Sequence, residues 1–190
     1  MPRLFAAIEP AAEVLNTIRE AQATLRRELA GEPIRWQHPG QAHLTLHFLG
    51  NVPEHDLPAV ARAVQGACRH SRPIDLKTAG FGTFPRVARP SILWLGVAGD
   101  LGELSALERH LSFLLTGLSS TKPKGRFTSH FTLGRVRRLE GGTRERVAAA
   151  LTLSSPKSVR WTATEVALIE SRLRPEGAEH HVRMRANLAP

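Results

Sequence analysis

The sequence has only one cysteine among its 190 residues. A single thiol excludes an internal disulfide framework and any zinc site built from several cysteines. Cys68 lies in the run Ala-Val-Gln-Gly-Ala-Cys, which is typical of a helix interior. We therefore expect a packed thiol rather than a nucleophile at this position.

Long apolar runs are missing as well. The first ten residues lack the apolar centre of a secretory signal, and no later stretch approaches the length that spans a bilayer. The sequence therefore predicts a cytoplasmic protein with no membrane partner. A phosphate loop ending in Gly-Lys-Ser or Gly-Lys-Thr is also absent, so ATP hydrolysis is not indicated.

Lysine is scarce, although the chain is strongly basic. Only four lysines occur, so the formal charge of +9 comes almost wholly from arginine. The planar guanidinium suits bidentate contact with phosphate, which favours an anionic partner and nucleic acid above all. A high-GC genome that encodes arginine in place of lysine is the alternative source of this composition.

Two short segments share one pattern of residue types. His-Leu-Thr-Leu at 43–46 is followed, 87 positions later, by His-Phe-Thr-Leu at 130–133. In an extended strand, each segment projects its histidine and threonine from one face and its apolar residues from the other. Chance supplies about 0.1 such tetrapeptides in a chain of this composition. Two imidazoles suit concerted acid and base catalysis near neutral pH, and two hydroxyls suit phosphoryl oxygens.

The remaining periodicity predicts short strands that alternate with amphipathic helices. Helices are expected over residues 10–29, 56–68, 101–115 and 143–151. Strands are expected over 3–8, 34–37, 43–49, 74–81, 92–97, 127–136, 160–173 and 181–188, with a basic loop at 119–126. One motif strand in each half predicts two similar lobes that face each other across a cleft.

A metal site is one alternative for the histidines. His43 and His47 have the i, i+4 spacing of a zinc-protease helix, but Leu44 stands where that motif requires glutamate. The surrounding residues are strand-like, so no metal site is expected. The other histidines lack ligand spacing with carboxylates and are expected at the surface or in caps; they are His38, His55, His70, His110, His180 and His181.

Two residues beside the motifs have more than one interpretation. Strict alternation places Arg135 on the same side as Phe131, but a bulge beside Gly134 could turn it toward a phosphate. A solvated arginine is the alternative at this position. Phe48 is expected in the core, with a wall for a nucleobase as its alternative.

The motifs and their surroundings resemble a known family. The stretches Ala-His-Leu-Thr-Leu-His-Phe-Leu-Gly at 42–50 and His-Phe-Thr-Leu-Gly-Arg at 130–135 are similar to those of the two-histidine (2H) phosphoesterases. The chain looks most like their LigT/ThpR-like branch, the RNA 2′,3′-cyclic phosphodiesterases of bacteria and archaea, also called 2′-5′ RNA ligases. The likeness covers nearly the whole chain and includes residues 3–8, 36, 84–85, 93–97, 170–173 and 177.

The resemblance implies an α+β fold of two lobes. Two antiparallel sheets, related by a pseudo-twofold axis, would carry helices on their outer faces and leave the active-site cleft between them. Residues 1–190 would form this one domain, which we expect to be monomeric. The implied reaction is hydrolysis of a terminal 2′,3′-cyclic phosphate, in RNA or a cyclic nucleotide, to a 2′-phosphomonoester. It needs no metal or cofactor, and the same site would also join RNA ends reversibly through a 2′-5′ linkage.

The resemblance also implies the roles of individual residues. His43 would donate a proton to the leaving oxygen and His130 would activate water, although the residues alone also allow the opposite assignment. Thr45 and Thr132 would bind the non-bridging oxygens of the phosphate, with Arg135 as a further substrate contact.

The chain departs from the family at a few positions. Ser129 stands where relatives usually have proline before the second histidine, Ser91 where many have arginine, and a late tyrosine is replaced around His180 and His181. Peripheral substrate contacts are therefore expected to differ. A non-catalytic basic RNA-binding module is the competing hypothesis; it accounts for the charge but leaves the matched His-Thr pairs without a purpose.

Overall fold

The computed structural model describes residues 1–121, 126–174 and 177–189, so the predicted basic loop at 119–126 lies partly outside the described residues. The elements follow the chain as β1 (Arg3–Ile8), α1 (Ala12–Glu28), β2 (Ile34–Trp36), the 3₁₀ turn η1 (Pro39–Gln41), β3 (Leu44–Asn51), the 3₁₀ turn η2 (Glu54–Asp56), α2 (Leu57–Arg69), β4 (Ile74–Arg86), β5 (Arg89–Gly99), α3 (Leu101–Leu114), β6 (His130–Val136), α4 (Thr143–Leu153), β7 (Arg160–Ala163), β8 (Glu165–Arg174) and β9 (Gly177–Asn187).

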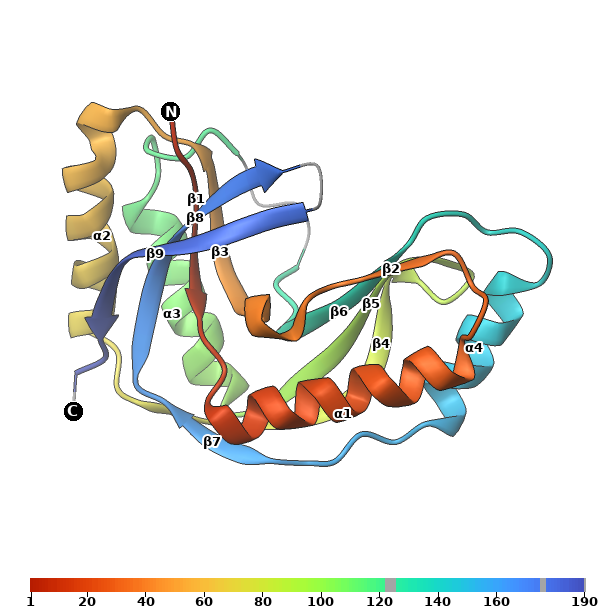
Figure 1. Ribbon diagram of the computed structural model, residues 1–190. Coiled ribbons are helices and arrows are strands. Elements are labelled where there is room, and N and C mark those ends of the chain that lie inside the picture. Colours follow the sequence, from red (N-terminus) through yellow and green to blue (C-terminus); the bar gives the residue numbers. More distant parts are fainter. Residues whose placement is uncertain (122–125, 175–176, 190) are drawn as a thin grey trace.

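The strands form one antiparallel sheet in the order β7-β4-β5-β6-β3-β1-β8-β9, with β2 paired to β6. Its two halves meet at the centre, where β3 and β6 pair through Leu44 and Phe131. Each half thus brings one motif strand to the junction, and the sheet curls around it (Figure 1). The expected α+β class with antiparallel sheets is confirmed, and the two expected sheets are joined edge to edge at this junction.

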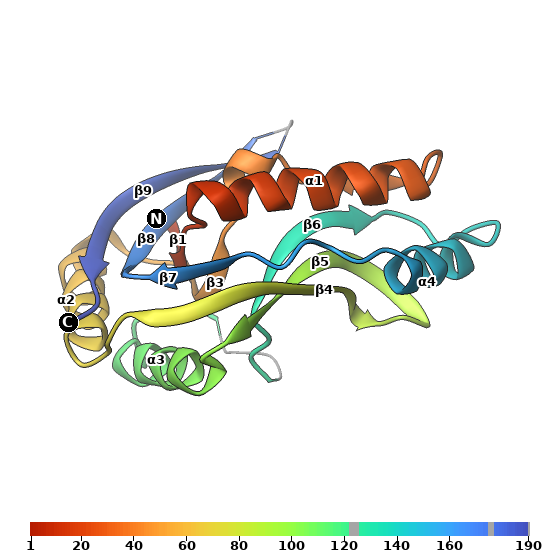
Figure 2. The same ribbon diagram turned by 90° about the horizontal axis from the view of Figure 1, so that it is seen from below.

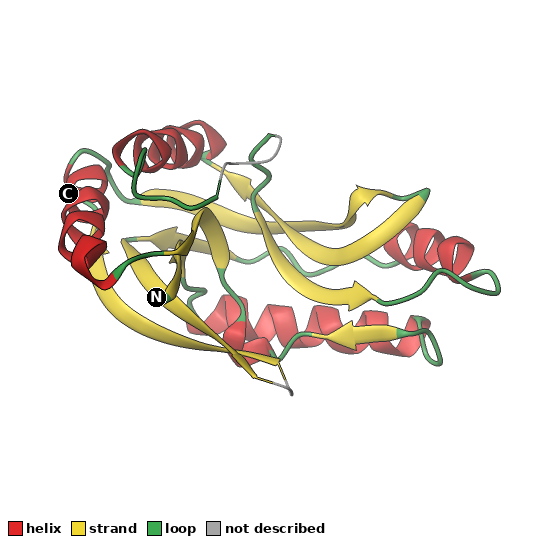
Figure 3. Cartoon of the chain, turned by 90° about the horizontal axis from the view of Figure 1, so that it is seen from above, coloured by secondary structure: helices red, strands yellow, loops and turns green. Residues whose placement is uncertain are grey.

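The helices lie around the outside of the strands (Figures 2 and 3). α1 and α4 contact each other and the strands near β6, whereas α2 and α3 contact each other and pack mainly on β3, β8 and β9. The buried stripe of α1 has helical spacing and comprises Val14, Ile18, Ala21 and Leu25. No helix in the described part of the chain is long and apolar enough to cross a membrane.

Cys68 is packed inside α2, as expected. Its side chain is buried, and this burial raises the pKa of the thiol to about 11. A thiol with such a pKa stays protonated near neutral pH, which removes the thiolate that a cysteine nucleophile requires.

One predicted strand is wrong. The pattern over 160–173 predicts a single strand, but the structure divides it at Thr164 into β7 and β8. β7 pairs with β4 at one edge of the sheet, whereas β8 pairs with β1 and β9 in the other half. The chain therefore crosses between the two halves at Thr164. The consecutive residues Val166 to Ile169 are all buried because β8 is covered on both faces.

Candidate active site

The two motif strands lie side by side at the centre of the sheet. β3 begins at Leu44 and β6 begins at His130, and the strands pair antiparallel through Leu44 and Phe131. Both apolar side chains are fully buried. Because side chains alternate along a strand, the histidine and threonine that flank each of them point to the opposite face. Continuing this antiparallel register by one residue each way brings each histidine opposite the threonine of the other motif.

A pocket of about 1250 Å³ opens on that face. All five predicted site residues line it, namely His43, Thr45, His130, Thr132 and Arg135. Its lining also contains several charged side chains in addition to Arg135, namely Arg3, Arg35, Arg126, Arg174 and Glu179. Among the described residues the pocket is therefore predominantly cationic, which favours an anionic ligand.

Each motif histidine is held by a backbone carbonyl two residues before it. His43 Nδ1 lies 2.9 Å from the Gln41 carbonyl oxygen, and His130 Nδ1 lies 2.7 Å from that of Thr128. A carbonyl can only accept, so Nδ1 of each ring carries the hydrogen and donates it. This leaves Nε2 of each ring available for proton exchange with a ligand.

Both histidines bind protons weakly in the protein alone. Burial lowers the pKa of His43 to about 4, opposed by the Gln41 carbonyl and reinforced by the charges of His180 and His130. Burial also lowers the pKa of His130, opposed by the Thr128 carbonyl and reinforced by the charge of Arg135. Near neutral pH both rings are therefore neutral until an anion lies beside them.

Both motif strands carry a bulge three residues after the histidine. Along β1 the pairing passes from Thr45 directly to His47, which leaves Leu46 as the extra residue of β3. Along β5 the pairing passes from Thr132 directly to Gly134, which leaves Leu133 as the extra residue of β6. An extra residue reverses the alternation of faces beyond it. The two halves of the site are thus matched in their bulges as well as in their motifs.

The bulges decide where Phe48 and Arg135 point. The prediction that Phe48 lies in the core is wrong: its side chain is 55% exposed and it lines the pocket. The bulge instead turns the preceding His47 inward, where its ring contacts Ser112 and Ser119, both at 2.9 Å. Arg135 occupies the equivalent place after the second bulge and also lines the pocket, which corresponds to the bulged alternative.

The second bulge is supported from α1. Gln22 is buried, and its Nε2 donates to the carbonyls of Leu133 at 2.7 Å and Gln37 at 2.6 Å. The Leu133 carbonyl also accepts from the Gln37 N–H at 2.9 Å. The Gln22 side chain therefore supplies a hydrogen-bond donor to the Leu133 carbonyl, which the bulge removes from the β5–β6 pairing.

Replacing Gln22 with leucine is expected to lower the free energy of unfolding by about 1–3 kcal/mol, because the Leu133 carbonyl loses one of its two donors and the Gln37 carbonyl loses its side-chain donor. The same change at Gln65, an exposed position of α2, is the matched control and is expected to alter stability by less than about 0.5 kcal/mol. Urea unfolding of both variants measures the difference. Equal effects of the two changes would show that the contact to the bulge contributes nothing.

Comparison with known proteins adds independent findings. The model of the LigT like Phosphoesterase family matches residues 8–94. An RNA 2′,3′-cyclic phosphodiesterase of Thermus thermophilus is 30% identical over 185 residues, which span 95% of this chain and 87% of that protein. The chain belongs to the LigT-like phosphoesterases.

Other relatives align over less of their length or resemble the chain mainly in fold. The RNA 2′,3′-cyclic phosphodiesterase of Aeropyrum pernix is 32% identical over 60% of this chain, and the alignment spans 65% of that protein, just under two thirds of its length. The crystal structure of E. coli LigT complexed with 3′-AMP is 23% identical, with a TM-score of 0.80 over 100% of this chain and 99% of that one.

The structure also brings to the site a residue that sequence reasoning missed. His180, expected at the surface or in a cap, lines the pocket beside His43. Its ring centroid lies 4.9 Å from that of His43 and 5.2 Å from that of Phe5. His180 follows the late glycine of this LigT-like chain, where a tyrosine is expected from the family. That departure from the family pattern is the signal that could have singled it out.

Other departures and histidines have structural places. Ser129 donates its hydroxyl to the Val97 carbonyl at 2.9 Å and so extends the pairing of β6 with β5. His38 caps η1 by accepting from the Gly40 N–H, as expected, and also lines the pocket. Within residues 1–121, 126–174 and 177–189, no group of three or more His, Cys, Asp or Glu side chains is arranged to hold a metal ion.

Proposed function

We propose that this LigT-like phosphoesterase hydrolyses 2′,3′-cyclic phosphate ends of RNA to 2′-phosphomonoesters by metal-independent acid and base catalysis. One observation carries the proposal. Both motif histidines donate their Nδ1 hydrogen to a backbone carbonyl, so the Nε2 atoms of both rings are available to exchange protons with a ligand in the same pocket. Relatives from Thermus thermophilus and Aeropyrum pernix bear the name of this activity. The arginine-rich lining suits a polyanionic substrate.

In-line hydrolysis needs a base on one side of phosphorus and an acid on the other. His130 Nε2 takes a proton from water as the water oxygen bonds to phosphorus. The bond between phosphorus and the ribose 3′ oxygen breaks, and protonated His43 gives that oxygen its Nε2 proton. The products are a 2′-phosphomonoester and a free 3′ hydroxyl. With a 5′ hydroxyl in place of water as the nucleophile, the same steps form a 2′-5′ linkage, and their reverse regenerates the cyclic phosphate and the 5′ hydroxyl.

The charges beside the two rings favour this assignment of acid and base. Arg135 is a permanent cation, and it opposes protonation of His130 at every pH. The positive charges that oppose protonation of His43 belong to His180 and His130, which are themselves titratable. An anionic substrate raises the pKa of both rings, and the permanent charge of Arg135 opposes that rise at His130.

The remaining motif residues act on the non-bridging oxygens. Thr45 and Thr132 point to the pocket from the two central strands, so one hydroxyl approaches phosphate from each half. Arg135 supplies a charged donor from the second half only. Donors already in position stabilise charge that increases on these oxygens as the bonds exchange.

The test is product analysis on a defined RNA that ends in a 2′,3′-cyclic phosphate, in excess chelator. We expect hydrolysis that the chelator does not slow, with a 2′-phosphomonoester as the sole product. Tight RNA binding without turnover would instead favour the non-catalytic module. Loss of activity in chelator, restored by a divalent metal, would overturn the metal-independent mechanism.

Anion binding is expected to be linked to proton uptake. Sulfate is a suitable probe because it remains a dianion between about pH 4 and pH 8. The pKa of His43 is about 4 in the protein alone, and a bound dianion raises it. Between these two pKa values the complex holds more protons than the protein alone, so affinity increases as the pH falls through this window. Each proton taken up tightens binding about tenfold per pH unit.

Titration calorimetry in two buffers of different ionisation enthalpy measures this uptake directly. His43→Gln is expected to remove most of the pH dependence, whereas His55→Gln, at an exposed position, is expected to retain it. A sulfate affinity that is independent of pH in the unmodified protein would contradict the prediction.

A further inference from the structure

His180 belongs to a compact group of three rings that line the pocket. The centroids of Phe5 and His43 are 4.5 Å apart, those of His43 and His180 are 4.9 Å apart, and those of Phe5 and His180 are 5.2 Å apart. His180 meets His43 edge-on, with an interplanar angle of 77°. The His43 ring therefore contacts a phenylalanine from β1 and a histidine from β9, and these two rings also contact each other.

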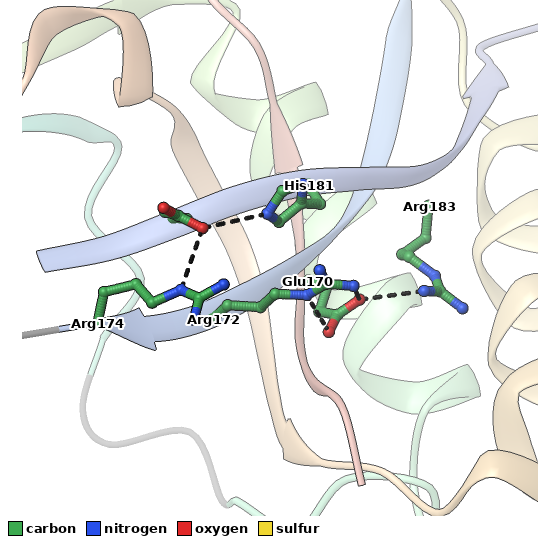
Figure 4. Close-up of polar contacts among 6 residues, drawn as sticks. Glu170, Arg172, Arg174, His181 and Arg183 are labelled. Carbon is green, nitrogen blue, oxygen red and sulfur yellow. Dashed lines mark hydrogen bonds and ion pairs between the residues drawn. The ribbon is translucent and has the colours of Figure 1, made fainter.

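The hairpin that carries His180 has two different faces. On one face Glu170 accepts from Arg172 at 2.9 Å and from Arg183 at 3.1 Å (Figure 4). Nearby, Glu179 pairs with Arg174 and His181, so these charges largely neutralise one another. His180 pairs across the hairpin with Ser171, and both line the pocket.

We propose that His180 is a positioning residue for His43: together with Phe5, its ring packs on the His43 ring and fixes the orientation needed to protonate the leaving oxygen. This inference rests on the proposed function, because it assigns His180 to the acid of that reaction. His180 is not required to touch the substrate. Its effect is exerted through the orientation and the proton affinity of the His43 ring.

The charge of His180 matters because it lies so close to His43. The lining of the pocket around these two rings contains further groups that can carry charge, namely Arg3, Arg35, His38, Arg126, His130, Arg135, Arg174 and Glu179, and His181 follows His180 in β9. Of these, His43 has resolved electrostatic effects only from His180 and His130 within the described residues. Burial lowers the pKa of His180 itself, opposed by a hydrogen bond to the Gln41 carbonyl and reinforced by the charge of His181. His180 is therefore neutral near pH 7, and a neutral His180 does not oppose protonation of His43.

Three substitutions of His180 distinguish the effect of its ring from the effect of a charge at this position. His180→Phe keeps a neutral ring and is expected to retain kcat within about threefold. His180→Ala removes the ring and is expected to lower kcat about tenfold with little change in KM, because His43 loses its packing partner. His180→Arg introduces a permanent cation and is expected to lower the His43 pKa by about one unit, with about tenfold lower kcat.

The control is His181→Gln, which changes the adjacent residue whose ring pairs with Glu179. It is expected to match the unmodified protein in kcat, in KM and in the pH profile. The pKa of His43, followed through its Cε1–H resonance, provides a measurement that does not depend on turnover. It is expected to fall in the His180→Arg protein and to stay within about half a unit in the His181→Gln protein.

The outcomes distinguish this inference from its alternatives. If His180 instead binds phosphate directly, His180→Arg would lower KM at an unchanged kcat and His180→Phe would raise KM, which overturns the positioning role. Equal behaviour of the His180→Ala and His181→Gln proteins would overturn it as well. If the unmodified protein has no hydrolase activity, the proposed function fails, while the His43 pKa still decides whether His180 controls that ring.

Discussion

Replacing His43 or His130 with alanine is expected to lower the rate of cyclic phosphate hydrolysis by roughly 10²–10⁴-fold, since each change removes one partner of the proton transfer. Because the two rings act in one concerted step, the double variant is expected to be little slower than either single variant. Single-turnover assays on an RNA with a cyclic phosphate end measure all three rates.

The pH profiles of the residual activities assign the two roles. The unmodified protein is expected to have a bell-shaped profile, with activity lost at low pH as the base is protonated and at high pH as the acid is deprotonated. His43→Ala should lose the alkaline limb, and His130→Ala should lose the acidic limb. His55→Ala, at an exposed histidine, is the control and should keep the whole bell. If His43→Ala instead lost the acidic limb and His130→Ala the alkaline limb, the assignment of acid and base would be reversed. Unchanged rates in both variants would refute the mechanism.

Replacing Arg135 with glutamine is expected to lower kcat/KM by roughly 10–10³-fold, because a charged donor to the non-bridging oxygens is lost. The same change removes the positive charge that lowers the pKa of His130. That pKa should therefore rise toward its ordinary value, and the acidic limb of the profile should move to higher pH. Steady-state kinetics across the pH range measure both effects in one series.

Arg138→Gln is the matched control for this prediction. Arg138 pairs with Glu140 at the surface, 3.8 Å apart, and the pair is exposed. Its replacement removes the same formal charge from the protein without changing a residue that lines the pocket, so kcat/KM should stay within about twofold. If both variants lose activity equally, the effect of Arg135 would be one of net charge rather than of a donor at the site.

The core of the site follows from the alternation of side chains in strands. The pattern His-apolar-Thr-apolar places Leu44 and Phe131 inward and the histidines and threonines outward, and the structure has both apolar residues fully buried. That the two strands are neighbours could be expected only from their matched motifs and from the resemblance to a family. The pairing of Leu44 with Phe131 joins residues too far apart for any local pattern to specify.

Alternation stops being informative where a strand gains an extra residue. His47 and Phe48 look like an outward and an inward residue, yet the bulge at Leu46 exchanges their faces. Bulges depend on which carbonyls find other partners, as the Leu133 carbonyl does with Gln22. That partner comes from 111 positions away in the chain. A period of two residues contains no information about such a contact.

The division of one predicted strand has a similar cause. Residues on both sides of Thr164 favour extended structure, and only the partners of β7 and β8 reveal that they belong to different halves. His180 likewise has no ligand spacing with residues near it in the sequence, so no local pattern predicts its place in the pocket. Its contact with His43 depends on the pairing of β8 with β1 and of β9 with β8.

The most direct test of the account is a crystal structure of the protein with a 2′-phosphorylated nucleotide. The account predicts one phosphate in the central pocket, with Nε2 of His43 and Nε2 of His130 both within about 3 Å of its oxygens, on opposite sides of phosphorus. A phosphate bound by only one of the two rings, or elsewhere on the surface with both rings free, would contradict it.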